Sequence, residues 1–216
     1  MKKYYYVLMS FFILCLLFQT YKVEAKLPLI DKVLVIDPGH GSIDPGTSYQ
    51  NIYEKDINLN ISKKIKKQLE KFGAKVILTR NDDYDLSSPN AYFRKKSDFD
   101  NRIYLINESN TDLYISIHLN YLLDSRYKGP QVFYDQENAG IANTIQKQLN
   151  KDLNGKRKIK KIPDNTYMYS RLKVPGVLIE CGFLSNSEER SLLVTDKYQQ
   201  TIAESITNGI KAIFKK

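Results

Sequence analysis

Cysteine and histidine are scarce in this sequence, and their scarcity excludes two kinds of site. The chain of 216 residues contains two cysteines, Cys15 and Cys181, and two histidines, His40 and His118. Cys15 lies in an apolar N-terminal segment, so loss of that segment leaves one thiol and no intramolecular disulfide. Two cysteines also cannot build a four-thiolate structural zinc site. Any zinc ion would therefore need imidazole and carboxylate ligands.

The N-terminus has the pattern of an export signal. Lys2 and Lys3 precede an almost unbroken apolar run from Tyr4 to Phe18, and the small residues up to Ala25 suit a signal-peptidase cut. Residues 1–25 are predicted to be a signal peptide, with an uncleaved membrane anchor as the alternative. Residues 26–216 are predicted to form one domain, because the chain shows no internal repeat and no second domain.

The chain is basic, with a formal net charge of +9. Loss of residues 1–25 removes three lysines and one glutamate and leaves +7. Such a charge favours anionic partners such as nucleic acid, acidic membrane or cell wall. No helix-turn-helix or zinc-finger spacing supports nucleic acid, and export argues against it. The lysines at 63–67 and in a presumed loop at 156–161 are most simply a solvated surface.

Short apolar runs alternate with amphipathic stretches along the chain. Strands are predicted at 32–36, 76–78, 112–117, 131–134 and 176–179. Helices are predicted at 56–72, 102–108, 139–149 and 202–214, with a long polar loop at 81–100. This alternation is typical of an α/β fold. It predicts a single-domain three-layer sandwich with a largely parallel twisted sheet flanked by helices.

Residues with catalytic chemistry follow three of the predicted strands: the segment Asp37–His40, then His118, then Glu180. In open parallel sheets the ligand crevice lies beyond the carboxyl ends of the strands, so these positions are expected to converge. Catalytic zinc usually has three protein ligands and an open position for water. Glu54, just before the first predicted helix, is the candidate third ligand. Capping of that helix is the simpler role for Glu54, but Asp56 can supply the same capping.

Four ordered motifs contain these residues. They are Asp37-Pro38-Gly39-His40-Gly41 with Asp44-Pro45-Gly46, Glu54-Lys55-Asp56 with Asn58-Leu59, Ser116-Ile117-His118-Leu119-Asn120, and Ile179-Glu180-Cys181-Gly182-Phe183-Leu184-Ser185-Asn186. Together they resemble the motifs of the zinc-dependent N-acetylmuramoyl-L-alanine amidases of the type-3 class, across almost the whole chain after its N-terminal segment. The resemblance implies that His40, Glu54 and His118 bind Zn²⁺ and that Glu180 is the catalytic glutamate.

The chemistry of amide hydrolysis asks for the same residue types. Zinc lowers the pKa of its water and polarises the scissile carbonyl, but a base must take the water's proton and an acid must protonate the departing amine. Glu180 can do both, and a salt-bridged or capping carboxylate is its alternative role. In an extended strand Cys181 points to the opposite face from Glu180, which predicts a buried, inert thiol.

Four polar residues are predicted to contact the substrate or to orient the zinc ligands, the last of them by meeting a peptide carboxylate, and ordinary salt bridging is the alternative for the arginines. They are Arg80, Arg102, Asn120 and Arg171.

The resemblance implies hydrolysis of the amide between N-acetylmuramic acid and L-alanine in peptidoglycan. The lone domain, the long loop and the string Ser116–Asn120 are most similar to the germination-specific members of spore-forming bacteria. This similarity implies a role in spore cortex maturation that leads to muramic-δ-lactam. The expected location is the outer face of the membrane, the cell wall or the forespore intermembrane space. Two alternatives are a catalytically silent wall-binding or regulatory module of the same fold, and an exported zinc hydrolase of another amide. The need for an accessory protein and the use of the N-terminal segment as a membrane tether are left open.

Overall fold

The computed structural model describes residue 4, residues 9–11, residues 27–135 and residues 137–215. The predicted signal or anchor segment, residues 1–25, therefore lies largely outside the described residues. Among the helices of the described ranges, none is long and apolar enough to cross a membrane.

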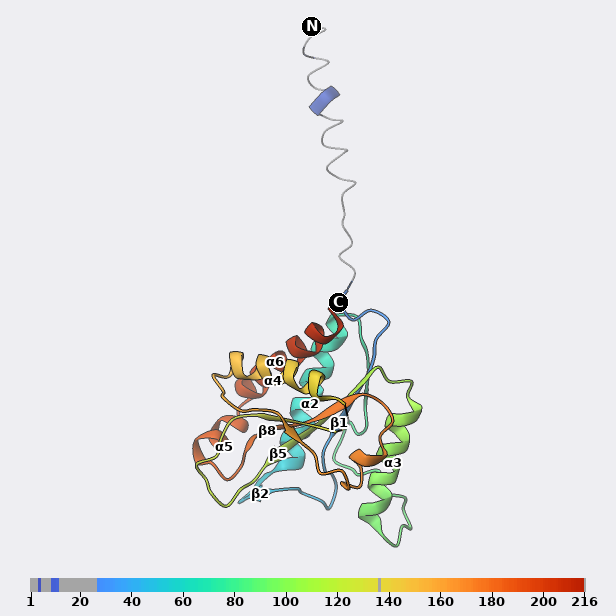
Figure 1. The fold of residues 1–216 in the computed structure, drawn as a ribbon, viewed down its shortest axis with the longest axis vertical. Helices are drawn as coiled ribbons and strands as arrows, with labels where there is room; N and C mark the ends of the chain where they lie inside the picture. Colours follow the sequence, from blue (N-terminus) through green and yellow to red (C-terminus); the bar gives the residue numbers. More distant parts are fainter. Residues whose placement is uncertain (1–3, 5–8, 12–26, 136, 216) are drawn as a thin grey trace.

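A six-stranded sheet forms the centre of the domain, with the strand order β4-β1-β5-β8-β6-β7 (Figure 1). Its strands are β1 (Val33–Pro38), β4 (Lys75–Leu78), β5 (Leu113–Asn120), β6 (Gln131–Tyr134), β7 (Lys160–Lys161) and β8 (Gly176–Phe183). The strands β4, β1, β5 and β8 are parallel to one another, whereas β6 runs antiparallel to β8. The prediction of a largely parallel sheet is confirmed. The short strands β2 (Ser48–Tyr49) and β3 (Ile52–Tyr53) form a separate antiparallel pair.

Helices cover both faces of the central sheet. They are α2 (Glu54–Lys71), α3 (Arg94–Glu108), α4 (Ala139–Asp152), α5 (Ser187–Leu193) and α6 (Asp196–Phe214), with a single 3-10 turn η1 (Tyr169–Arg171). The helices α2, α4 and α6 pack together on one face, and α3 lies on the other (Figure 1). The three layers of the predicted sandwich are confirmed.

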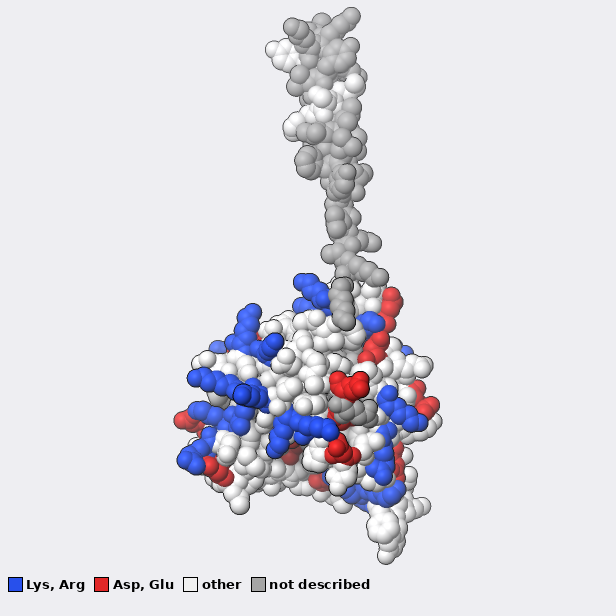
Figure 2. Space-filling view, viewed as in Figure 1, with Lys and Arg blue, Asp and Glu red and all other residues white. Residues whose placement is uncertain are grey.

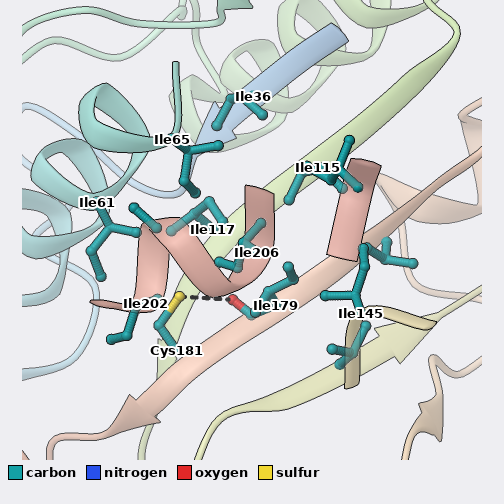
Figure 3. Packing of buried hydrophobic residues seen from close by; sticks show 14 of the residues in the cluster. Ile36, Ile61, Ile65, Ile115, Ile117, Ile145, Ile179, Cys181, Ile202 and Ile206 are labelled. Carbon is teal, nitrogen blue, oxygen red and sulfur yellow. Dashed lines mark hydrogen bonds between the residues drawn. The ribbon is translucent and has the colours of Figure 1, made fainter. Parts of the chain in front are cut away.

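The main core lies between the sheet and the layer formed by α2, α4 and α6. Ile61 and Ile65 of α2, like Ile202 and Ile206 of α6, recur after four residues, which places them in one stripe of each helix. All four are fully buried. Figure 3 shows these stripes around Ile117 of β5. The apolar pattern read from the sequence therefore marks the faces that hold these layers together.

The helix α3 begins earlier than predicted. It starts at Arg94, so the polar stretch predicted as a loop over 81–100 ends before this residue. The buried stripe of α3 is Asp98, Arg102 and Ile106, again spaced by four residues. Because two of these three residues are charged, a search for apolar periodicity does not detect the first turns of the helix.

The segment predicted as a basic loop contains an edge strand. Lys160 and Lys161 form β7 and pair in parallel with Phe133 and Tyr134 of β6. Two adjacent lysines give no alternation of apolar and polar residues, so the sequence pattern missed this strand. Lysines on an edge strand also discourage pairing with another chain.

Candidate metal centre

The three predicted ligands meet at one edge of the sheet. His40 follows β1, Glu54 is the first residue of α2 rather than preceding the helix, and His118 lies inside β5. Nε2 of His40 and Nδ1 of His118 lie 3.1 Å and 3.0 Å from the same atom, Oε1 of Glu54. The candidate ligand atoms all lie within 4.8 Å of one another. The two imidazoles and the carboxylate therefore form a group that could hold a metal ion.

The backbone around His40 is shaped to bring the ligands together. His40 has a φ of 65°, in the left-handed region, a conformation that costs about 1 kcal/mol or more for a residue with a side chain. A Cβ atom at Gly39 would lie 2.2 Å from Cε1 of His118, and one at Gly46 would lie 2.6 Å from Oε2 of Glu54. Only glycine at these two positions lets the ligands approach one another this closely.

Glu54 is held in place by donors from three segments. Its Oε1 accepts the backbone N–H of Leu119 at 3.0 Å, and its Oε2 accepts that of Thr47 at 2.8 Å. Nδ2 of Asn58, one turn further along α2, lies 3.2 Å from Oε1 of Glu54 and 3.3 Å from the carbonyl oxygen of Gly39. Partners of this kind orient ligating carboxylates in metal sites. The carboxylate is therefore aimed at the two histidines by the fold itself.

The centre of this group favours a positive charge. Nδ1 of His40 lies 2.9 Å from Oδ2 of Asp44, and Nε2 of the same ring faces Glu54. Burial opposes protonation of His40, but Asp44 and Glu54 outweigh burial and raise its pKa to about 9. Burial also opposes ionisation of Glu54, yet hydrogen bonds with His118 and His40 hold its pKa well below the usual range. A carboxylate and two imidazoles are a donor set that zinc accepts, so these residues fit a metal ion.

Glu180 faces the same space from the neighbouring strand. It is paired in register with His118. Its strand neighbours Ile179 and Cys181 lie on the side of β8 that faces α6 (Figure 3), so Glu180 points to the opposite side. Cys181 is fully buried in the main core, as predicted for an inert thiol. Burial, followed by the negative charge of Glu54, raises the pKa of Glu180 to about 8.

The carboxyl group of Glu180 has an unused oxygen. Its Oε2 atom is buried and has no hydrogen-bond partner among the residues that the structure describes. A buried carboxyl oxygen without a partner is costly, and such groups are found where chemistry requires them. Glu180 is therefore placed to exchange a proton with a ligand in the space beside the candidate metal ligands.

Two buried arginines hold the loop that carries His40. Arg80 has no exposed area and donates to the carbonyl oxygens of Pro38 and Gly39 at 3.0 and 2.9 Å. Arg102 is 2% exposed and donates to the carbonyl oxygens of Pro38 and His40 at 2.9 and 2.8 Å. Arg80 lies too deep to touch a substrate. These contacts fit a role in which the two arginines orient the loop that carries His40 without being metal ligands themselves.

Two buried carboxylates balance the charge of Arg102. Nη1 of Arg102 lies 2.6 Å from Oδ1 of Asp37, and its Nε lies 3.0 Å from Asp98. Asp37 also accepts the hydroxyl groups of Thr79 at 2.6 Å and Ser116 at 3.1 Å. Burial opposes ionisation of Asp37, but Arg102 and the hydrogen bond from Thr79 hold its pKa below the usual range. Sequence reasoning missed Asp98 because this residue lies in the stretch that was predicted to be a loop.

A cavity of about 600 Å³ opens beside the candidate ligands. Its lining comes from the loop after β1, from α2, α3, β5 and β8, and from the segment before β8. The lining residues outside the ligand group include Lys95, Phe99, Arg102, Thr166, Tyr167, Met168, Tyr169, Leu178 and Glu180. Of the predicted substrate contacts, Arg102 lines this cavity and Asn120 does not. Arg171 lines a separate cavity and stacks on Tyr167, with its guanidinium carbon 3.9 Å from the ring centroid.

One wall of the cavity was not foreseen from the sequence. Phe99 of α3 stacks on Tyr167 with ring centroids 6.2 Å apart, and the hydroxyl of Tyr167 donates to Asp100 at 2.6 Å. These residues bring the segment before β8 against α3. Tyr167 lies in a stretch without apolar periodicity, so no local pattern signals its place in the site.

The fold and the site together define a class of protein. An α/β domain places a group that could hold a metal ion at the carboxyl ends of parallel strands, with a buried glutamate beside it, an arrangement suited to metal-assisted hydrolysis. The sequence matches the N-acetylmuramoyl-L-alanine amidases over residues 34–212, and the chain belongs to this family. It is therefore an enzyme, a peptidoglycan amidase, and the predicted family and activity are confirmed.

Relatives and solved structures agree with this assignment. The chain is 41% identical to the germination-specific N-acetylmuramoyl-L-alanine amidase of Bacillus subtilis (strain 168), over 88% of this chain and 82% of that protein. It is 31% identical to the probable cell wall amidase LytH of Staphylococcus aureus, over 88% of this chain and 61% of that protein. The CwlD amidase of Clostridioides difficile, solved in complex with the GerS lipoprotein, superposes with a TM-score of 0.79 at 38% identity. The superposition covers 84% of this chain and 98% of that chain.

Proposed function

We propose that this amidase is a zinc enzyme in which His40, Glu54 and His118 hold the ion and Glu180 moves the proton. The observation that carries the proposal is the register of two parallel strands, which puts Glu180 next to His118 on the face where the three ligands meet. When bound, zinc supplies Lewis-acid chemistry, because it lowers the pKa of water and polarises a carbonyl group.

The residues of this chain have separate roles in the proposed reaction. Glu180 accepts the proton of the attacking water on a carboxyl oxygen and then gives it to the nitrogen of the departing L-alanine. In the metal-free protein burial raises the pKa of Glu180 to about 8, and the positive charge of bound zinc would lower this pKa, so that the carboxylate can accept a proton near neutral pH. Arg80 and Arg102 hold the loop of His40, and Asp44 fixes the orientation of the His40 ring. Substrate contact is proposed for Arg102 in the cavity wall, and for Asn120 and Arg171 only where a substrate extends beyond the cavity.

The bond cleaved on this proposal joins the lactyl group of N-acetylmuramic acid to L-alanine. Incubation of the zinc-loaded protein with purified peptidoglycan should give glycan strands whose muramic acid carries no peptide, together with free peptides that begin with alanine. Mass spectrometry of the digested glycan detects both products. Peptides released by cleavage at any other amide would contradict the proposed bond.

The proposed biological role is in the maturation of the spore cortex. The support is the identity of 41% to a germination-specific amidase over most of both chains. Removal of the peptide from muramic acid is the step needed before a second enzyme can close muramic-δ-lactam. Deletion of the gene in its spore-forming host should abolish cortex muramic-δ-lactam and leave peptide-bearing muramic acid. Spores of the deletion strain with normal lactam content would reject this role, but they would not contradict the amidase chemistry.

We also propose that the protein is exported and acts outside the cytoplasm, at the membrane surface, in the cell wall or in the forespore intermembrane space. The apolar N-terminal run supports export. Strand β1 runs from Val33 towards His40, so the chain enters the domain at the end of the sheet opposite the candidate metal centre (Figure 1). A tether at that end would leave the cavity facing away from the membrane, towards the wall.

An accessory protein is a further part of this proposal. The support is that the CwlD amidase, 38% identical to this chain, was solved in complex with a lipoprotein. Purification of the tagged protein from sporulating cells should recover an exported lipoprotein in fixed ratio. Recovery of the amidase alone, with full activity, would contradict the need for a partner.

A further inference from the structure

Two rows of side chains lead from the catalytic cavity to the edge of the sheet. In the antiparallel pairing of β8 with β6, Glu180 lies opposite Gln131 and Leu178 lies opposite Phe133. Directly opposite residues of neighbouring strands point to the same face. Since Glu180 and Leu178 line the cavity, Gln131 and Phe133 lie next to it on the same face of the sheet.

Each row ends in a lysine of the edge segment. Phe133 pairs with Lys160 of β7, and Nζ of Lys160 lies 5.9 Å from the centroid of the Phe133 ring. Lys158 lies two residues before Lys160. The carbonyl oxygen of Lys158 accepts a hydrogen bond from Nε2 of Gln131 at 2.8 Å. The rows are therefore Glu180–Gln131–Lys158 and Leu178–Phe133–Lys160.

The packing of the intervening residues confirms the direction of these lysines. Ile159, between them, packs against the main core on the side of α2, α4 and α6. Residues that alternate in an extended chain point to opposite faces, so Lys158 and Lys160 point to the cavity side. Phe133 agrees, because it packs against the second apolar cluster, which contains Tyr169 of the cavity wall.

These two ammonium groups are not committed to carboxylates of the protein. Among the described residues, no carboxylate lies within ion-pair distance of Lys158 or Lys160. Their neighbour Lys161 has one, since its Nζ lies 2.6 Å from Oδ1 of Asp164. On the opposite side of the cavity, Lys95 forms an ion pair with Asp44. Lys158 and Lys160 are therefore free to bind an anionic ligand on this face.

The surrounding charge strengthens the attraction. From Ala139 to Lys161 the chain has seven lysines and arginines and one acidic residue, Asp152. Figure 2 shows Lys and Arg side chains gathered on the side of the molecule where α4 lies. A field of one sign raises the local concentration of anions and weakens with salt.

We propose that Lys158 and Lys160 bind carboxylates of the peptide that peptidoglycan carries on muramic acid, with the peptide lying across the two rows. The proposal rests on the proposed placement of the scissile amide beside Glu180. Two strand spacings separate Glu180 from Lys158, about 10 Å. An extended peptide covers this distance in about three residues. A carboxylate a few residues after the cleaved L-alanine then meets the lysines.

The competing explanation is protection of a sheet edge, for which lysines are also suited. Edge protection needs charge on β7 but does not depend on which face the lysine points to. Substrate binding needs the face of the cavity. Lys161 lies on the same strand, points to the other face and thus provides a matched control.

The test compares a Lys158→Gln, Lys160→Gln double variant with a Lys161→Gln variant, each as the zinc-loaded full chain. The substrate is a soluble muramoyl tetrapeptide, prepared with free carboxylates and with the same carboxylates amidated. The double variant should raise KM for the free form by about 3- to 10-fold, as expected for exposed charge pairs, and leave kcat unchanged. KM for the amidated form should not change, and Lys161→Gln should match the wild type on both substrates.

A binding measurement separates this proposal from the proposed function. The fluorescently labelled free-carboxylate substrate is titrated into a Glu180→Gln protein with and without the two lysine changes, at low and at high salt. Weaker binding in the lysine variant at low salt, with the difference lost at high salt, supports the proposal. This result stands even if the wild type cleaves no substrate, because absence of cleavage would reject only the proposed function. Equal affinities, or an equal loss with the amidated substrate, would overturn the proposal that the lysines bind carboxylates.

Discussion

His118 and Glu180 lie directly opposite each other on the parallel strands β5 and β8. One is a candidate metal ligand and the other is the proposed proton carrier, so the spacing between these two side chains is fixed by hydrogen bonds of the sheet rather than by a loop. Both strands are buried along most of their length. A rigid support of this kind holds catalytic groups within a fraction of an ångström, which proton transfer requires.

The first prediction concerns the metal ligands. A His40→Ala, His118→Ala double variant removes two of three ligands, so it should purify without zinc, whereas the wild type should hold about one ion per chain. Elemental analysis of both proteins measures this. The matched control is Asn120→Ala, which lies on β5 beyond His118 and should keep its zinc. Full zinc retention in the double variant would contradict the proposed site.

The second prediction concerns Glu180. Glu180→Gln keeps the shape of the side chain and removes its ability to accept a proton. The variant should retain zinc and lose turnover by roughly 100-fold or more, as expected for loss of a general base. Zinc content and release of muramoyl peptides are measured on the same sample. Near-normal turnover would remove Glu180 from the mechanism.

The third prediction uses the raised pKa of Glu180 in the metal-free protein. Its pKa is about 8 in the fold against an ordinary value of 4.5, so between these values the folded state holds a proton that the unfolded state has lost. Stability therefore falls as pH rises through this window, by at most about 1.4 kcal/mol per pH unit, and is level below it. Glu180→Gln abolishes the effect. Urea denaturation of both metal-free chains should show that the free energy of unfolding of the variant rises relative to that of the wild type from pH 5 to pH 8. A constant difference between the two chains would refute the prediction.

The fourth prediction concerns the arginine beneath the ligand loop. Arg102→Met leaves Asp37 and Asp98 buried without their partner, so it should lower the free energy of unfolding by about 3–5 kcal/mol. The control is Arg126→Met, because the Arg126 ion pair with Asp124 is exposed to solvent and should contribute little to stability. Urea denaturation compares the two. An equal effect of both changes would show that the buried network does not stabilise the fold.

The fifth prediction concerns the N-terminal segment. The described domain is already closed at this end, where the N–H of Leu29 donates to the carbonyl oxygen of Phe72 at 3.0 Å. A chain that begins at Lys26 should therefore fold and bind zinc like the full chain. Circular dichroism and zinc content check this. If the shorter chain is insoluble while the full chain is well folded in detergent, the segment belongs to the core.

The sequence by itself determined the layers of the fold and the residues that gather at the candidate site. Apolar residues at a spacing of four, as in Ile61 and Ile65, predict which face of a helix is buried, because burial of one stripe is a local property of the helix. Two histidines after apolar strands, with Glu54 and Glu180 in ordered motifs, predict the ligands and the base. Each of these signals is contained in a short stretch of chain.

The tertiary structure alone decided which distant residues share a face and what the charged ones do. Arg80 and Arg102 are alike in sequence terms, yet one is sealed under the ligand loop and the other also reaches the cavity wall. Lys158 became a neighbour of Gln131 only through the pairing of β6, β7 and β8. Register between strands depends on hydrogen bonds and packing between segments far apart in the chain, and periodicity within one segment carries no information about it.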